Sequence, residues 1–157
     1  MQYEHDTLFF TLLSRFQRLY AKSLSMRLSP INVQPGYLSI LHYLWQRDNI
    51  TQKELHQHMD IEQATLSNTL KRMERDNLIL ITPNPKDRRR HLITLTSTGI
   101  ELKPSVQEAI DDIRKTVNTG LTINDRRYLK RIMRQMTEHL ENDQIEPLFV
   151  LLDEVTD

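Results

Sequence analysis

A helical stretch with a polar face lies at residues 62–76. At 100° per residue, Leu66, Leu70 and Met73 fall within about 60° of one another, which predicts a buried stripe. Small, polar or basic side chains occupy the remaining arc: Gln63, Ala64, Thr65, Ser67, Asn68, Lys71, Arg72 and Arg75. Side chains of this kind fit the major groove of DNA, where amides suit adenine and hydroxyls suit several bases. The chemistry indicated is hydrogen bonding to base edges.

A run of three arginines forms the second group: Arg88, Arg89 and Arg90. It lies in the stretch 83–90, between two short β-branched, apolar runs at 79–82 and 92–95. An apolar–turn–apolar pattern of this length predicts a hairpin with a long basic tip. Guanidinium groups on such a tip can reach a minor groove or the phosphates of a duplex.

Each group has a plainer interpretation, as a solvated helix face and as a charged surface loop. Their order along the chain favours DNA binding, because a short helix, a turn, a polar-faced helix and a basic hairpin together are typical of a helix-turn-helix followed by a wing. In that arrangement we expect Ser67 and Asn68 to face bases. We expect Gln52 and Lys53, in the first turn of the preceding helix, to contact phosphates.

Apolar side chains at three- and four-residue spacing predict six helices that position these groups. The first ends at Ser29-Pro30, and the second runs from about Pro35 to Asp48-Asn49. The third opens at the capping box Thr51-Gln52-Lys53-Glu54, and the fourth is the polar-faced helix at 62–76.

The last two helices follow the hairpin. A long fifth helix begins at Thr96-Ser97-Thr98 and continues to Val117. Thr119-Gly120 breaks it, and Thr122 with Asp125 predicts a capped start for the sixth helix. The tail from Ile145 is acidic but too apolar to be typical of disorder.

Composition limits the class of protein. The 157 residues carry 21 basic and 21 acidic side chains, but residues 1–100 hold 13 basic against 9 acidic ones, whereas residues 101–157 hold 8 against 12. A polyanionic partner is therefore expected to meet the first two thirds of the chain. No apolar run is long enough to span a membrane, and the N-terminal residues lack a signal-peptide pattern, so we expect no membrane contact and a cytoplasmic location.

The sequence gives little support for catalysis or metal binding. The absence of cysteine excludes disulfides, thiolate metal sites and thiol nucleophiles, and three glycines are too few for a phosphate cradle. His56 and His58 lie two residues apart and point to different sides of a helix. A metal site assembled across the fold stays open as an alternative, but we expect no enzyme activity, no catalytic residue, no bound metal and no cofactor.

The stretch from Gln34 to Gly99 resembles the MarR (multiple antibiotic resistance regulator) family of winged-helix transcription factors. The residues that carry the resemblance are Gln34-Pro35-x-x-Leu38-x-x-Leu41, Thr51-Gln52-x-Glu54-Leu55, Ala64-Thr65-Leu66-Ser67, Leu70, Arg72-Met73-Glu74, Leu78-Ile79, Pro83-Asn84-Pro85-Lys86-Asp87-Arg88-Arg89 and Leu95-Thr96-x-x-Gly99. Three positions depart from the family pattern. Asn77 stands where glycine is usual, although asparagine tolerates a left-handed backbone. Asn68 and Ile81 stand where arginines are common.

The resemblance implies a mainly α fold: a winged helix-turn-helix with a two-stranded β-wing and dimerisation helices at both termini. We expect residues 1–157 to form one such domain, with the DNA-binding part at about 34–99 and the dimerisation helices at about 1–30 and 98–157. The resemblance also suggests that Asp87 pairs with Arg89. Apolar stripes on helices one, five and six point to a homodimer as well, since a two-fold dimer can present two recognition helices to successive major grooves. The interface residues expected are Phe9, Leu12, Leu13, Phe16, Leu140 and Phe149.

The function implied is that of a transcriptional regulator, a repressor on a palindromic operator in double-stranded DNA. A small aromatic or phenolic effector, bound between the dimer helices and the wing domain, is expected to release it. Two alternatives stay open: an accessory or architectural DNA-binding protein without an effector, and a winged-helix module that binds protein or RNA.

Overall fold

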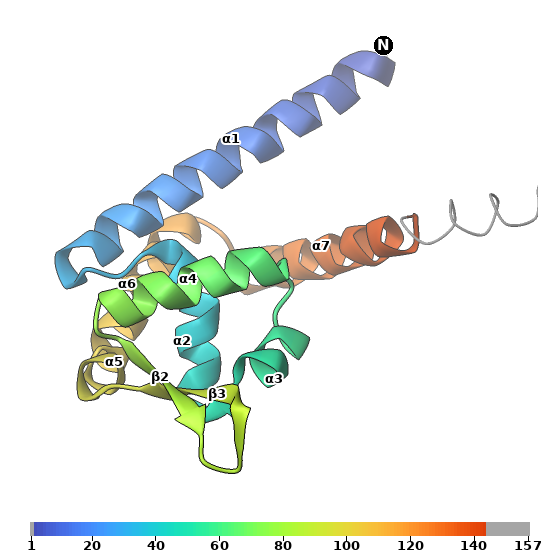
Figure 1. The fold of residues 1–157 in the computed structure, drawn as a ribbon. Helices are drawn as coiled ribbons and strands as arrows, with labels where there is room; N and C mark the ends of the chain where they lie inside the picture. The colour runs from blue at the N-terminus through green and yellow to red at the C-terminus, as the bar shows by residue number, and fades with distance from the viewer. Residues whose placement is uncertain (1, 144–157) are drawn as a thin grey trace, which may run out of the picture. The chain divides into compact units, whose positions relative to one another are not determined.

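The computed structural model describes residues 2–143, whose helices and strands follow the predicted order with three differences (Figure 1). The elements are α1 (Gln2–Leu28), the 3-10 turns η1 (Ser29–Ile31) and η2 (Pro35–Tyr37), α2 (Leu38–Leu44), β1 (Ile50–Thr51), α3 (Gln52–Gln57), α4 (Gln63–Arg75), β2 (Ile79–Asn84), β3 (Asp87–Leu95), α5 (Ser97–Glu101), α6 (Lys103–Val117) and α7 (Ile123–Asp143). The chain divides into two units, Met1–Arg114 and Lys115–Asp157. No helix in the described range combines the length and apolarity that a membrane crossing requires.

The first difference is a third strand. The predicted wing had two strands, but Ile50–Thr51 pairs with Ile93 and Leu92 of β3, so the sheet is antiparallel with the order β1-β3-β2. The sequence pattern predicts only a capping role for Thr51. A residue that caps a helix has extended backbone, as Thr51 does at φ −77° and ψ 156°, and can therefore also pair as a strand.

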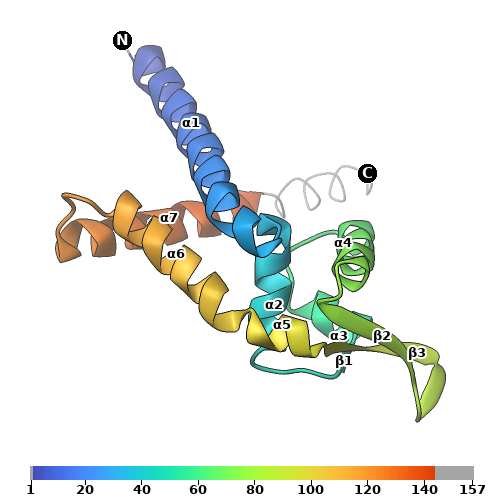
Figure 2. The same cartoon turned by 90° about the vertical axis from the view of Figure 1, so that its left-hand side faces the viewer.

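The second difference concerns the arginine run, which was predicted to lie on a long tip. Figure 2 shows the hairpin of β2 and β3. Strand β2 extends to Asn84 and β3 begins at Asp87, so the three arginines belong to β3. Asn84 pairs with Asp87 and Pro83 with His91, which leaves residues 88–90 opposite no residue of β2. Pro83 lies at this shift in the strand register, and proline has no backbone N–H to donate to the neighbouring strand. The arginines therefore form a bulge on the strand rather than a free loop.

The third difference is that the predicted fifth helix is two helices, α5 and α6, which meet at Leu102. Pro104 accounts for the break, because proline has no N–H and its ring clashes with the carbonyl four residues earlier. The apolar stripe of α6 was expected to contribute to a dimer interface. Instead Val106, Ala109 and Ile113 are buried in the core of the first unit.

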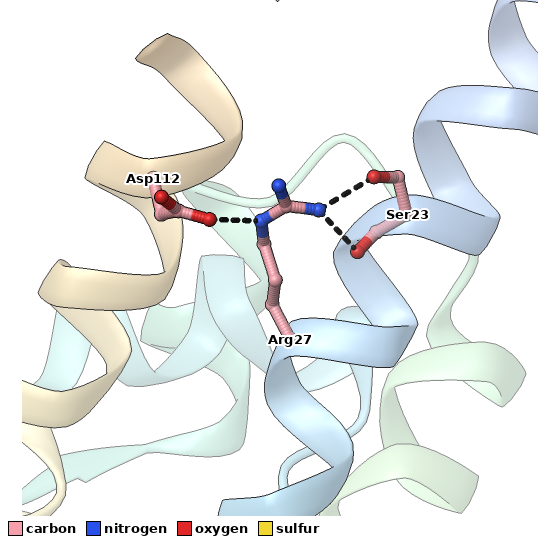
Figure 3. Close-up of polar contacts among 3 residues, drawn as sticks. All are labelled: Ser23, Arg27 and Asp112. Atoms are coloured by element: carbon pink, nitrogen blue, oxygen red, sulfur yellow. Dashed lines mark hydrogen bonds and ion pairs between the residues drawn. The ribbon is translucent and has the colours of Figure 1, made fainter. Parts of the chain in front are cut away.

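The core of the first unit runs from the end of α1 to α6. It includes Leu24 and Leu28 of α1, the stripe Leu66, Leu70 and Met73 of α4, and Ile79 and Ile93 of the sheet. Arg27 contributes a polar contact at its edge: Nε donates to Oδ2 of Asp112 at 2.7 Å, and Nη1 donates to the hydroxyl and carbonyl oxygens of Ser23 (Figure 3). The last turns of α1 are thereby tied to α6.

Tight packing at Gly99 joins the segment after α4 to the hairpin of β2 and β3. A Cβ added at Gly99 would overlap the carbonyl oxygen of Leu78, and it would lie 3.1 Å from Cδ2 of Leu95. Two hydrogen bonds hold the same place: the Thr96 N–H donates to the Leu78 carbonyl at 3.0 Å, and Trp45 Nε1 donates to the Gly99 carbonyl at 2.9 Å. Only glycine allows the backbone of α5 to approach Leu78 this closely.

We therefore expect Gly99→Ala to lower the free energy of unfolding by about 3 kcal/mol, the upper end of the usual cost of overpacking. Urea unfolding followed by the fluorescence of Trp45 measures this directly, since Trp45 is the single tryptophan and binds Gly99. Gly36→Ala is the matched control, because nothing lies within 4 Å of a Cβ there. Equal stabilities of the two variants would contradict this account of the Gly99 contact.

Candidate nucleic-acid interface

The short helix α3 begins at the capping box that the sequence predicts. The Glu54 carboxylate accepts hydrogen bonds from the N–H and the hydroxyl of Thr51, both at 2.8 Å, and the Glu54 N–H donates to Thr51 Oγ1 at 3.2 Å. These bonds, the backbone one first, hold the pKa of the Glu54 carboxyl below its ordinary value. The start of α3 is thus well defined, and it carries Gln52 and the exposed Lys53.

Histidines stabilise the turn between α3 and α4. The His56 ring nitrogen Nε2 lies 3.0 Å from the Ile61 carbonyl oxygen, so it acts as a donor that closes the turn. His58 stacks on Tyr43 with ring centroids 5.0 Å apart. Both histidines therefore have protein partners, and the described part of the chain contains no group of three or more potential metal ligands.

Helix α4 separates its buried and exposed faces as predicted. Leu66, Leu70 and Met73 are buried. The exposed members of the predicted contact set are Gln63, Ala64, Thr65, Asn68, Lys71 and Arg72, and Ser67 is half-buried. The side chains that could reach base edges thus lie on one rigid helix, whose opposite side is held by the core.

One contact between α3 and α4 is not predicted by the sequence. Gln52 Nε2 donates a hydrogen bond to Ser67 Oγ at 2.6 Å. The sequence pattern predicts separate roles for the two residues, a phosphate contact for Gln52 and a base contact for Ser67. Their separation of 15 positions gives no local signal, so only the packing of α3 on α4 brings them together.

The C-terminal end of α4 is closed by backbone and side-chain bonds. Asn77 has the left-handed φ of 57° expected of it, and the N–H groups of Asn77 and Leu78 donate to the carbonyls of Glu74 and Met73. Asp76 accepts hydrogen bonds from Arg75 Nε at 3.0 Å and from the Tyr37 hydroxyl at 2.8 Å. These bonds, from Arg75 first, lower the pKa of the Asp76 carboxyl. Burial, aided by Asp76, raises the pKa of the Tyr37 hydroxyl to about 12.

The wing presents basic groups beside this helix. Arg90 is exposed and its Nε lies 3.3 Å from Oδ2 of Asp87. The resemblance suggested Arg89 as the partner of Asp87, but the side chains of Arg88 and Arg89 lie outside what the structure describes. The backbone nevertheless places the run Arg88–Arg90 at the bulge of β3, next to the hairpin turn.

Two helices outside this region expose apolar side chains. On α1, Phe9, Leu12, Leu13 and Phe16 are 41–63% exposed, and on α7 Leu140 is 61% exposed. None of the residues of α7 is buried within the described chain. Phe149, the sixth residue expected at a dimer interface, lies outside the described residues.

Comparison with known proteins finds a family match for the central part of the chain. Residues 34–91 match the MarR family. The organic hydroperoxide resistance transcriptional regulator of Bacillus subtilis (strain 168) is 35% identical over 100 residues, which cover 59% of this chain and 65% of that protein. The chain thus spans just under two thirds of the length of that relative. The matching relatives are transcriptional regulators and not enzymes.

Solved structures share the fold. A MarR mutant from E. coli complexed with operator DNA has a TM-score of 0.72 at 20% identity, covering 80% of this chain and 91% of that one. An organohalide-sensing transcriptional regulator in its 2,4-dichlorophenol-bound form has a TM-score of 0.79 at 19% identity, covering 85% and 80%. The mainly α winged-helix class predicted from the sequence is confirmed. Residues 34–91 are therefore a MarR family domain, in a chain whose homologues and structural neighbours are MarR-type regulators.

Proposed function

We propose that this chain is a DNA-binding transcriptional regulator that reads a duplex with α4 and holds it with α3 and the wing. The observation that carries the proposal is the division of α4 into two faces. Its apolar side is buried, while Asn68, Lys71 and Arg72 are exposed beside the basic hairpin. A helix of this kind, packed on a shorter one, suits insertion into a major groove.

The protein is proposed to act as a homodimer on a palindromic operator. Eight large apolar or aromatic side chains between Leu8 and Tyr20 of α1 are 38–70% exposed, which is unusual for a helix that stays in water. A second copy of the chain could bury such a surface by two-fold symmetry. Two recognition helices about 34 Å apart would then match one turn of duplex.

We propose further that the protein is a repressor and that binding of a small effector releases it from DNA. The relative solved with 2,4-dichlorophenol supports an aromatic or phenolic ligand as the effector class. The relative from Bacillus subtilis is named for organic hydroperoxide resistance, but the present 157 residues contain no cysteine. Thiol oxidation is therefore excluded as the trigger in this sequence.

Selection of DNA from a random duplex library by the purified protein tests the function. We expect a palindromic site whose affinity exceeds that of random duplex by at least about a thousandfold at physiological salt. Equal affinity for selected and random duplexes would contradict the proposal and favour an architectural role. Preference for RNA or a protein over any duplex would favour an interaction module.

Substitutions in α4 and α3 should affect binding differently. Asn68→Ala is expected to reduce discrimination by about 1–3 kcal/mol at one or two positions of each half-site, because an amide can bind a base edge through two hydrogen bonds. Lys53→Ala should weaken binding to all sequences equally, since a phosphate contact carries no base information. Competition binding with single-base variants of the selected site separates the two effects. The reverse pattern would mean that α4 is not the reading helix.

The basic side chains of the hairpin lead to a prediction about the salt dependence of DNA binding. Arg90→Ala should weaken operator binding by about 1–3 kcal/mol and make the slope of log K against log salt shallower by about one, the signature of a lost phosphate contact. Arg114→Ala is the control, because Arg114 is an exposed arginine of α6 that pairs with Asp111 away from the hairpin. Titrations between 50 and 200 mM salt, a range that resolves such slopes, measure both variants. Identical slopes for the two variants would exclude Arg90 from the interface.

The dimer is tested on α1. Phe16→Glu should give a folded monomer that no longer binds a palindromic site, because Phe16 is half exposed in the single chain and its loss leaves the core intact. Ser25→Glu adds the same charge on the opposite side of α1 and should leave the dimer unchanged. Light scattering reads the mass, which for the unaltered protein is expected near twice the 18.7 kDa of one chain. A monomeric unaltered protein would remove the basis for a two-fold operator.

A further inference from the structure

The contact between Gln52 and Ser67 determines what the serine hydroxyl can offer to a ligand. Gln52 is the first residue of α3 and Ser67 lies in the N-terminal half of α4, and both side chains are half-buried. Because Gln52 Nε2 donates at 2.6 Å, Ser67 Oγ is the acceptor of this bond. A serine hydroxyl has one hydrogen and two lone pairs, so the hydrogen remains available.

No acceptor for that hydrogen is found among the residues that the structure describes. The neighbouring hydroxyl of Thr69 differs in this respect, since Thr69 Oγ1 donates to the Thr65 carbonyl within α4 at 2.8 Å. Ser67 instead lies on the flank of α4 that faces α3, where its hydroxyl accepts from Gln52 and the residue is half-buried. The serine is therefore oriented as a donor before any ligand arrives.

We propose that Gln52 is a positioning residue that fixes Ser67 as a hydrogen-bond donor to a base edge in the major groove. The acceptor would be N7 of a purine, O6 of guanine or O4 of thymine. This inference rests on the proposed function, since it requires α4 to lie in a DNA groove. It assigns Gln52 a role in sequence preference, in contrast to the phosphate contact expected from the sequence.

The proposal predicts different outcomes for two substitutions of the same residue. Gln52→Ala removes the donor, so the Ser67 hydroxyl can rotate and the preference at one base-pair position should fall roughly tenfold. Gln52→Glu places a carboxylate, which only accepts hydrogen bonds, at the same distance. Ser67 must then donate to the carboxylate and can only accept from DNA, so the preference should move towards N6 of adenine or N4 of cytosine.

The experiment compares five proteins on single-base variants of the selected site: the unaltered protein, Gln52→Ala, Gln52→Glu, Ser67→Ala and the Gln52→Ala/Ser67→Ala double variant. Gln57→Ala, a glutamine exposed at the other end of α3, is the matched control and should leave the preference unchanged. We expect both single alanine variants to lose preference at the same base-pair position. The double variant should lose no more than Ser67→Ala, because the effect of Gln52 passes through Ser67. Circular dichroism and thermal unfolding verify that each variant is folded.

Three results would overturn the inference. If Gln52→Ala weakens all duplexes equally and makes the salt slope shallower by about one, Gln52 binds a phosphate. If the two alanine effects add, the residues act independently. If Gln52→Glu weakens binding without moving the base preference, the orientation of the hydroxyl does not set it. Failure of the unaltered protein to select any duplex would instead refute the proposed function, and this inference with it.

Discussion

The close approach of Leu78 to Gly99 is the constraint on which the geometry of the candidate interface depends. Helix α4 ends at Arg75, and β2 begins at Ile79, directly after Leu78. Gly99 belongs to α5. The Leu78 carbonyl accepts from Thr96, and the Thr96 hydroxyl both donates to the Asn77 carbonyl and accepts from the Gly99 N–H. Since α4 and the hairpin diverge from this one junction, its packing sets the angle between the two elements proposed to contact DNA.

Helix α4 is held at its C-terminal end, at Ser67 and along its buried side, which suits a helix that must present side chains with little freedom. Its C-terminal end is bound to Tyr37 through Asp76, and Ser67 nearer its start is bound to Gln52. The buried stripe keeps the helix from rotating about its axis. Side chains that are oriented before binding lose less conformational entropy on complex formation, and this favours discrimination between similar sequences.

Many apolar side chains of α1 and α7 are exposed in the single chain, unlike those of the core. Leu24 and Leu28, at the end of α1, are buried, whereas the residues from Leu8 to Tyr20 are exposed in the single chain. The same helix thus packs in its own unit through its last turns and leaves its earlier turns uncovered. Exposed large apolar side chains along one helix favour association with a further protein surface, and this is the basis for the proposed dimer.

Local sequence patterns determined much of this protein. The period of Leu66, Leu70 and Met73 predicts which side of α4 is exposed, the capping boxes at Thr51 and Thr122 mark the starts of α3 and α7, and Asn77 has the left-handed backbone expected of it. These features depend on residues at most a few positions apart. The pairing of Ile50 with Ile93, the bond from Gln52 to Ser67 and the contact of Gly99 with Leu78 were decided by the tertiary structure. Each joins residues 15 or more positions apart, and at such separations the partner is chosen by how the elements pack, which no local periodicity records.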